Sequence, residues 1–559
     1  MRPPQSQSYP TGDPPVVTRR LAALLALPLL LAACDTPLPL PMAKVVPASG
    51  GSVVEALYGG FPGPLNPLFE TEDNARDVDS LIYEGLTTVA SDQSAAPLLA
   101  RSWSVSDDQL RYTFELRQDV RWADGQRFTA DDVMFTFGVL QSADYDDPGM
   151  QFWKEIEVER LGDYEVRFTL KAPTAAFPLA LRQGIVSRHA FAGVPVKAMS
   201  GDRRSGAAAF GTGPFRAASV SRDRRTVTLD RNPYFNRPRP YLDHFSFRTY
   251  PTLGDALDAV SRGEADSVGA LQPPQLGSLA KRQDLTVREL KTFSFAALLF
   301  NLSPELSVYF NPPAVRQAIS QGVDRRALIS AVLDGRADPA PGPLPPTDWA
   351  YSPEAANKYP YDPDAARRTL DQAGWKLNPQ TGLRSRDGRD LSLSLVTADA
   401  YPYRQVAENV SSQLKQVGVQ LRVESVPASV LVGRYVLGRS YQLALVAFDN
   451  GPDPDQYGLW HSGAPKDSLN FASQLVPRQA LIDKDLEDGR AASDRASRAG
   501  AYRDFQDLVE DAAPGVFLFE PHYAYVLSNR VHGVRTNSVV EPVDRFQHAA
   551  EWYVASKGL

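Results

Sequence analysis

Segments of alternating polar and apolar residues recur in the first half of the chain. Residues 111–116, 164–170 and 226–229 alternate in this way, as half-buried β-strands do, because successive side chains point to opposite faces. Thr129 precedes Ala130, Asp131 and Asp132. Threonine is a good helix N-cap and acidic residues suit a first turn, so the sequence predicts that a helix begins after Thr129.

A longer helix is predicted over residues 313–333, where apolar residues recur at helical spacing. Pro313 fits the first turn, where no amide hydrogen is needed. Gly335 follows the last apolar position and suits a helix end. The sequence therefore indicates one helix of several turns.

Residues 391–448 show the order strand, helix, strand, helix, strand. Residues 391–395 and 419–423 alternate, residues 429–437 are predicted to be helical, and 441–448 form an apolar run. Strands separated by helices indicate a largely parallel α/β sheet. Ligands bind beyond the carboxyl ends of the strands in such sheets, so the loop after Phe448 is a candidate site.

The bulk composition limits the classes of protein. A chain of 559 residues is long enough for two or three domains. The 59 basic and 66 acidic residues are spread along the chain, so no basic stripe predicts a nucleic-acid partner. The single cysteine excludes an intrachain disulfide and a CxxC site.

The N-terminus carries a targeting pattern. Arg19 and Arg20 precede an apolar run, Leu21 to Ala33, that is shorter than the roughly 20 residues of a membrane span and typical of a signal-peptide core. The run ends at Cys34, and small residues before this cysteine resemble the bacterial lipoprotein signal. The resemblance implies a signal peptide over 1–33 and a lipid on Cys34 that holds the protein at a membrane surface outside the cytoplasm.

Alternatives to the lipoprotein interpretation stay open at this point. One is an ordinary secretory signal followed by an incidental cysteine, and another is a twin-arginine signal, which Thr18-Arg19-Arg20 resembles faintly. Residues 34–50 contain four prolines, so this segment is predicted to be an extended, poorly packed tether. No later run is long and apolar enough to cross a bilayer.

A series of motifs in the body of the chain occurs in a fixed order. The series is Leu65-Asn66-Pro67, Tyr83-Glu84-Gly85-Leu86, Trp122-Ala123-Asp124-Gly125, Phe128-Thr129-Ala130-Asp131-Asp132-Val133, Gly211-Thr212-Gly213-Pro214-Phe215, Arg231-Asn232-Pro233-Tyr234-Phe235, Val315-Arg316-Gln317-Ala318-Ile319 and Ala373-Gly374-Trp375. Over roughly residues 52–530 the chain resembles the large solute-binding proteins of peptide and nickel ATP-binding-cassette importers, extracellular solute-binding protein family 5.

The resemblance implies an α/β fold of the two-lobed periplasmic-binding-protein type II (Venus-flytrap) kind, with an extra subdomain. Lobe 1 is then expected to be discontinuous, the extra subdomain to be an insertion in it, and lobe 2 to be continuous. The expected boundaries are 51–90, 208–292 and 516–559 for lobe 1, 91–207 for the subdomain, and 293–515 for lobe 2.

The implied function is capture of an extended solute, most readily an oligopeptide, between the lobes and its delivery to a permease driven by ATPase subunits. The protein is expected to act as a monomer without a cofactor. A non-peptide solute, such as an oligosaccharide or a metal chelate, and a role as a surface sensor remain open. A secreted hydrolase is disfavoured, because no GxSxG elbow is present.

The resemblance also implies where ligand contacts lie. Peptide-binding relatives place an anchoring aspartate where this chain has Asn450 in Phe448-Asp449-Asn450-Gly451-Pro452-Asp453-Pro454. Asparagine offers an ammonium group no full charge, so either Asp449 substitutes or the ligand lacks a free amine. A simple turn is the alternative, since these residue types favour turns.

Further candidates for ligand contact are aromatic and basic residues. Arg404 can bind a carboxylate through two parallel hydrogen bonds, and the aromatic or imidazole candidates can line the mouth of a cleft, although core packing is at least as common for them. These candidates are Tyr401, Tyr403, Arg404, Trp460, His461, Phe152 and Trp153.

No metal site is expected. Asp144, Asp146, Gly149 and Glu155 match part of a calcium-loop template, but Pro148 occupies a ligating position. The six histidines form no HExxH pair.

Overall fold

The computed structural model describes residues 45–558 apart from 71, 146–150, 280, 465–477 and 537–538. Cys34, the predicted signal peptide and most of the calcium-loop pattern lie outside these residues. The end of the predicted tether is strand β1 (Val45–Ala48), which pairs with β23 (Ala555–Gly558). Among the described helices, none has the length and apolar character needed to cross a membrane.

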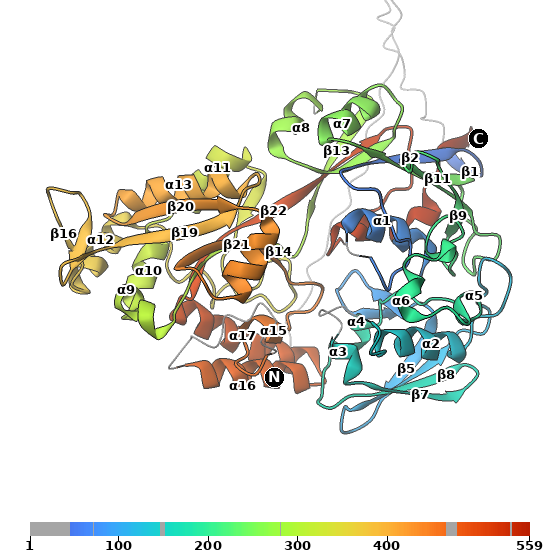
Figure 1. The fold of residues 1–559 in the computed structure, drawn as a ribbon, viewed down its shortest axis with the longest axis horizontal. Coiled ribbons are helices and arrows are strands. Elements are labelled where there is room, and N and C mark those ends of the chain that lie inside the picture. Colours follow the sequence, from blue (N-terminus) through green and yellow to red (C-terminus); the bar gives the residue numbers. More distant parts are fainter. Residues whose placement is uncertain are drawn as a thin grey trace, which may run out of the picture. The chain divides into compact units, whose positions relative to one another are not determined.

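One large sheet runs through the body of the protein, with strand order β20-β19-β21-β14-β22-β12-β2-β11-β10-β9 (Figure 1). We call β20, β19, β21 and β14 the lobe 2 half and β12, β2, β11, β10 and β9 the lobe 1 half. The bounds are β20 Gln420–Val426, β19 Ser392–Ala398, β21 Leu443–Asp449, β14 Ser294–Phe300, β22 Gly515–Ser528, β12 Ser267–Leu271, β2 Ser52–Tyr58, β11 His244–Tyr250, β10 Thr226–Arg231 and β9 Phe215–Val220.

Strand β22 belongs to both halves of this sheet. Its first part pairs with β14, from Gly515 opposite Leu299 to Phe519 opposite Ala296. Its second part pairs with β12 and with β13 (Leu285–Lys291), and β15 (Ala337–Pro339) pairs with its middle. The chain also passes between the halves from β13 to β14. Paired strands therefore join the two lobes.

The lobe 2 half confirms the predicted α/β pattern. Strand β19 is parallel to both β20 and β21, and α13 (Tyr403–Lys415) connects β19 to β20. The predicted helix 429–437 is a short α14 (Ala428–Val430) that continues as a π-helix over Leu431–Leu437. The buried faces of these elements are divided between the two lobe 2 cores.

The single helix predicted over 313–333 is wrong. Two helices, α10 (Pro313–Gln321) and α11 (Arg325–Leu333), occupy this stretch. The Asp324 carboxylate between them accepts a hydrogen bond from the Ala327 amide at 2.9 Å. An aspartate N-cap satisfies an amide that a helix end leaves unpaired, so a second helix begins here although the apolar spacing continues.

A separate four-stranded antiparallel sheet lies beyond lobe 1. Its order is β5 (Ala100–Val105), β6 (Arg111–Leu116), β8 (Glu165–Thr169) and β7 (Glu157–Gly162). Helix α2 (Ala130–Leu140) begins after Thr129 as predicted, with a capping box completed by Asp132. Phe137 of α2 packs edge-on against Phe168 of β8, so this sheet and helix share one core.

The remaining elements cover the sheets or connect them. They are α1 Asp73–Ile82, β3 Thr87–Val89, β4 Ala95–Pro97, α3 Gln151–Lys154, α4 Phe177–Ala180, α5 Arg188–Phe191, α6 Val196–Met199, α7 Leu253–Ser261, α8 Pro273–Leu279, α9 Ser307–Phe310, α12 Pro363–Gln372, β16 Lys376–Leu377, β17 Arg384–Arg386, β18 Arg389–Asp390, α15 Tyr457–Trp460, α16 Gln479–Ala491 and α17 Arg495–Ala512, with 3₁₀ turns at 203–205, 304–306, 542–546 and 549–551.

Candidate functional site

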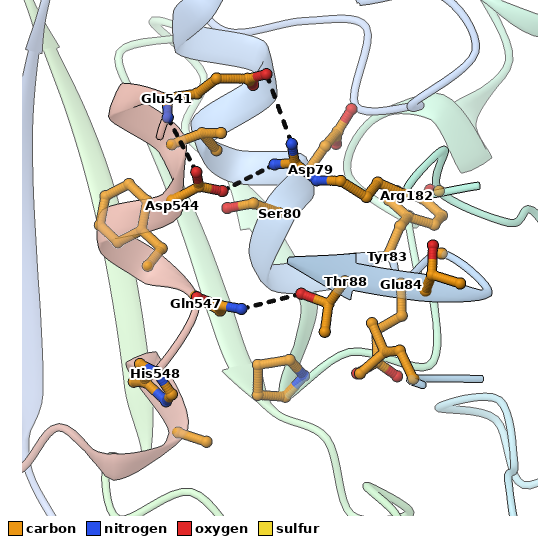
Figure 2. Close-up of a pocket in the computed structure, with 18 of the residues that line it drawn as sticks. Asp79, Ser80, Tyr83, Glu84, Thr88, Arg182, Glu541, Asp544, Gln547 and His548 are labelled. Atoms are coloured by element: carbon orange, nitrogen blue, oxygen red, sulfur yellow. Dashed lines mark hydrogen bonds and ion pairs between the residues drawn. The ribbon is translucent and has the colours of Figure 1, made fainter. Parts of the chain in front are cut away.

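A cavity of about 1420 Å³ is lined by segments of both lobes. The lobe 1 side comprises α1, the segment that follows it, α4 and residues 533–553, and the lobe 2 side comprises the loop after β21 from Asn450 to Asp455. Figure 2 shows part of the lobe 1 wall, with side chains of α1 and of the C-terminal segment beside one another. The loop predicted from strand topology is therefore part of a cavity.

Helix α1 is fixed against the rest of lobe 1 by a close backbone approach. Its apolar face, which includes Val78, Leu81 and Ile82, is fully buried in the lobe 1 core. The Gly213 amide donates a hydrogen bond to the Ile82 carbonyl oxygen at 2.9 Å. A Cβ atom at Gly213 would lie 2.7 Å from that oxygen, so this contact requires glycine and explains part of the Gly211-Thr212-Gly213 motif.

The C-terminal segment adds an ion-pair network to this wall. Arg182 contacts Asp544 at 2.8 Å and Glu541 at 3.6 Å, and Gln547 donates to the Thr88 hydroxyl at 2.9 Å (Figure 2). These bonds hold residues 541–547 next to α4 and β3. The wall is polar and mostly neutralised within itself.

The lobe 2 loop is also held by its own contacts. The Asn450 amide donates to the Phe293 carbonyl oxygen at 3.1 Å, and its side-chain Nδ2 donates to the Pro343 carbonyl oxygen at 3.1 Å. Gly451 then turns the chain with φ 67°, a conformation that favours glycine. The Asn450 Oδ1 atom is buried and has no hydrogen-bond partner among the described residues, so it is an available acceptor.

Among the described residues, eight acids line the cavity, and seven of them pair with arginine. The seven pairs are Glu70–Arg76, Glu84–Arg237, Asp453–Arg498, Asp455–Arg490, Glu541–Arg182, Asp544–Arg182 and Glu551–Arg535. Burial raises the pKa of Glu70 to about 7 although Arg76 lowers it. The eighth acid, Asp79, has no ion pair in the part of the chain that the structure describes.

Of the nine residues predicted to contact ligand, Asn450 lines this cavity. Asp449 lies one residue earlier, is exposed, and accepts a hydrogen bond from Ser294. The Tyr401 hydroxyl donates to the Val332 carbonyl oxygen at 2.7 Å, and Tyr403 packs against the lobe 2 cores. Ligand contact by Asp449 and the two tyrosines stays a prediction without support from this geometry.

Arg404 and the pair Trp460 and His461 also lie outside the cavity lining. Arg404 is exposed and pairs with Glu408 at 3.2 Å. Trp460 is buried and its ring nitrogen donates to Gln456 at 2.7 Å. His461 is buried, stacked on Tyr457 with ring centroids 3.9 Å apart. Trp460 and His461 therefore pack beneath the loop and support it.

Phe152 and Trp153 belong to α3, which packs against α2. Trp153 is buried against Phe137, with ring centroids 4.9 Å apart. Phe152 is exposed and touches Trp153. Neither lines the cavity, so their assigned role as ligand contacts also stays a prediction.

Sequence reasoning missed Asp79, Arg182 and residues 541–547. Asp79 carried a usable signal, because it interrupts the apolar face formed by Ala75, Val78 and Ile82 on a short helix. Buried charges without partners are rare, so an acid on that face marks a special environment. Arg182 and residues 541–547 lie far apart in sequence, and no local pattern brings them together.

No set of three or more His, Cys, Asp or Glu side chains lies close enough to hold a metal ion within the described ranges. Seven of the described acids of the cavity are instead paired with arginine. The arrangement is suited to binding a polar solute through hydrogen bonds and ion pairs.

Known proteins resemble this chain in both sequence and structure. The chain is 28% identical over 517 residues to the oligopeptide-binding protein AppA of Bacillus subtilis, covering 91% of this chain and 92% of that protein. The AppA structure in complex with a nonapeptide superposes with a TM-score of 0.72, 25% identity, 91% coverage of this chain and 100% of AppA.

Two further proteins show the range of the similarity. The probable di/tripeptide-binding protein 5 of Pseudomonas aeruginosa is 30% identical, covering 84% of this chain and 92% of that protein. NikZ of Campylobacter jejuni, solved with Ni(L-His), shares the fold with a TM-score of 0.72 at 24% identity, covering 90% of this chain and 99% of NikZ. The model of the bacterial extracellular solute-binding proteins, family 5 (middle) matches residues 94–470, which is more than half of the chain. Taken with the two-lobed α/β fold and the cavity between its halves, this match shows that the chain belongs to the bacterial extracellular solute-binding proteins of family 5.

Proposed function

We propose that this protein binds a peptide in the cavity and delivers it to the permease of an ATP-binding-cassette importer. The observation that carries the proposal is a cavity of about 1420 Å³ lined by both lobes. Pockets for drug-sized ligands have volumes of roughly 300–1,000 Å³, so this cavity suits a larger, extended solute. The names of AppA and of the di/tripeptide-binding protein support a peptide as that solute.

The mechanism follows from the way the lobes are joined. Strands β22 and the β13–β14 connection pass between them, and Asn450 and α1 contribute to the cavity from opposite lobes. A ligand that contacts both lobes favours the conformation in which they are close together. The permease then recognises the loaded form. The protein binds and releases its solute unchanged, as a monomer and not as an enzyme.

The lipid anchor is a second part of the proposal. Cys34 follows the apolar run 21–33 and small residues, the pattern that resembles a lipoprotein signal. Diacylglycerol on the Cys34 sulfur then holds the protein at a membrane surface outside the cytoplasm. Metabolic labelling with a palmitate analogue tests this: the wild type is expected to be labelled and Cys34→Ala to be unlabelled. Labelling of the variant would contradict the anchor.

Identification of the solute tests the binding function. The full chain is purified from the membrane fraction in mild detergent and analysed by native mass spectrometry, and the released ligand is sequenced. A set of short-peptide masses is the expected result. An oligosaccharide, a metal chelate or a bare protein that ignores added peptides would overturn the peptide assignment.

A further inference from the structure

Asp79 is a buried carboxylate in the cavity wall without a partner. It lies on α1 between Val78 and Ser80, is 3% exposed, and neither carboxylate oxygen has a hydrogen-bond partner among the described residues. Figure 2 shows it among the side chains that line the cavity, near Ser80 and Tyr83. The helix therefore presents a carboxylate that no cation of the described residues neutralises, with the Asn66 backbone as a favourable polar neighbour.

The other acids of the same cavity show how unusual this is. Each of the seven has an arginine at ion-pair distance, for example Asp453 with Arg498 at 2.6 Å and Asp455 with Arg490 at 2.7 Å. A buried carboxyl group without a partner is unfavourable, because it loses its hydration without compensation. An apolar residue would suit the face of α1 better. The position of Asp79 is explained if its partner comes from outside the chain.

We propose that Asp79 binds an ammonium group of the ligand. This deepens the proposed function and rests on it, because it names a positively charged peptide as the preferred ligand. The ammonium group is either the α-amino group of the peptide or the side chain of a lysine. Asn450 on the opposite wall carries no charge, but its unpaired Oδ1 accepts a hydrogen bond from the same or a neighbouring N–H.

The protonation of Asp79 supports this assignment. Burial raises the pKa of Asp79 well above its usual value, the nearby Glu70 carboxylate raises it further, and the Asn66 backbone offsets part of the effect. Around it, Tyr83 faces the group from α1 and Arg76 is paired with Glu70.

On the same wall, Arg182 is paired with Glu541 and Asp544. The free protein therefore holds a proton on Asp79 over a wider pH range than an exposed aspartate does. An arriving ammonium group stabilises the ionised form and expels that proton.

The test is a competition among defined peptides. Wild type, Asp79→Asn and Asp73→Asn, each as the full chain in detergent, are incubated with a synthetic mixture of short peptides. The mixture contains free and N-acetylated forms, with and without lysine. Asp73 lies on the same helix and its side chain is 93% exposed, so its variant controls for the loss of one negative charge.

Native mass spectrometry then measures which peptides are bound. Wild type and Asp73→Asn are expected to enrich peptides with an ammonium group, and Asp79→Asn to lose that preference by roughly 10- to 100-fold. Loss confined to free-amine peptides assigns the α-ammonium group, and loss confined to lysine peptides assigns the side chain. Calorimetry in two buffers of different ionisation enthalpy measures the protons released on binding. The wild type is expected to release a proton when it binds the peptide, and Asp79→Asn is not.

Two results overturn the inference in distinguishable ways. If wild type binds peptides and Asp79→Asn keeps the same preference, Asp79 is no anchor while the proposed function stands. If wild type binds no peptide, the proposed function fails as well. Thermal unfolding identifies a misfolded Asn variant, and Asp79→Ser, which is smaller, then provides the same comparison.

Discussion

The two walls of the cavity handle charge in different ways. On the lobe 2 wall, Asp453 and Asp455 are each paired with an arginine from the helices beneath, and Asn450 is neutral. On the lobe 1 wall, Asp79 has no ion-pair partner among the described residues. The acids of the first wall are neutralised without a ligand, whereas the second wall lacks one cation. This difference teaches that a cavity can keep its shape with neutralised acids and select its ligand with a single buried carboxyl group.

The largest change in unfolding free energy is expected when an arginine that neutralises an acid of the lobe 2 wall is removed. Arg498→Met leaves the buried Asp453 carboxylate without its partner, which costs about 3–5 kcal/mol of unfolding free energy because an unpaired buried charge remains. Urea unfolding measures the change. The control is Arg503→Met, whose partner Asp504 is exposed, with an expected change below about 0.5 kcal/mol. Equal effects in the two variants would refute a special role for the Asp453 pair.

A smaller effect is expected when a charge is added to the lobe 2 wall. Asn450→Asp loses the hydrogen bond to the Pro343 carbonyl oxygen and places two acceptors together, which costs about 1–3 kcal/mol. Combined with Asp79→Asn, it moves the negative charge from one wall to the other. We expect the double variant to recover part of the ammonium preference, because the carboxylate then lies on the same cavity at the position of the anchoring aspartate in peptide-binding relatives. No recovery would show that a carboxylate at position 450 cannot replace Asp79.

The pH dependence of the unfolding free energy gives a separate test of Asp79 on the lobe 1 wall. The raised pKa of Asp79 means that the folded protein binds a proton more tightly than the unfolded chain does. Its contribution is therefore complete at pH values below the usual 3.8 and is lost as pH rises through the raised value. Asp79→Asn removes this loss, so its unfolding free energy relative to wild type should increase with pH. Parallel pH profiles from urea unfolding would contradict the prediction.

The smallest effect is expected at a residue outside both walls. Arg404→Ala removes exposed contacts with Asp399 and Glu408, and exposed ion pairs contribute roughly 0–1 kcal/mol. Stability should change by less than about 0.5 kcal/mol, and peptide affinity should not change. Isothermal titration with a peptide identified from the purified protein measures the affinity. A tenfold loss would restore the sequence-based assignment of Arg404 to the site.

Elements with a strong local pattern were predictable from sequence. Residues 111–116 form β6 and the run after Thr129 forms α2, because alternation and capping chemistry act over a few residues. The break between α10 and α11 was missed because α10 ends at Gly322 and Asp324 begins α11 without disturbing the apolar spacing.

The candidate site was less predictable. Topology pointed to the loop after β21, and Asn450 of that loop lines the cavity. The lobe 1 wall was missed because it combines α1, Arg182 and residues 541–547, which are brought together by tertiary structure alone. Aromatic candidates such as Trp460 and Trp153 are buried with partners of their own. Residue type cannot distinguish such packing from a ligand contact.

The position of β22 in the sequence has a consequence for the order of synthesis. This strand spans Gly515–Ser528, near the end of the chain, yet it lies in the middle of the large sheet. A nascent chain that stops before Gly515 leaves β14 and β12 each with an unpaired edge facing the other half. Such edges pair with other chains unless they are covered. Neither half of the sheet can therefore be completed until almost the whole protein has left the ribosome, and the chain must be kept from aggregating until then.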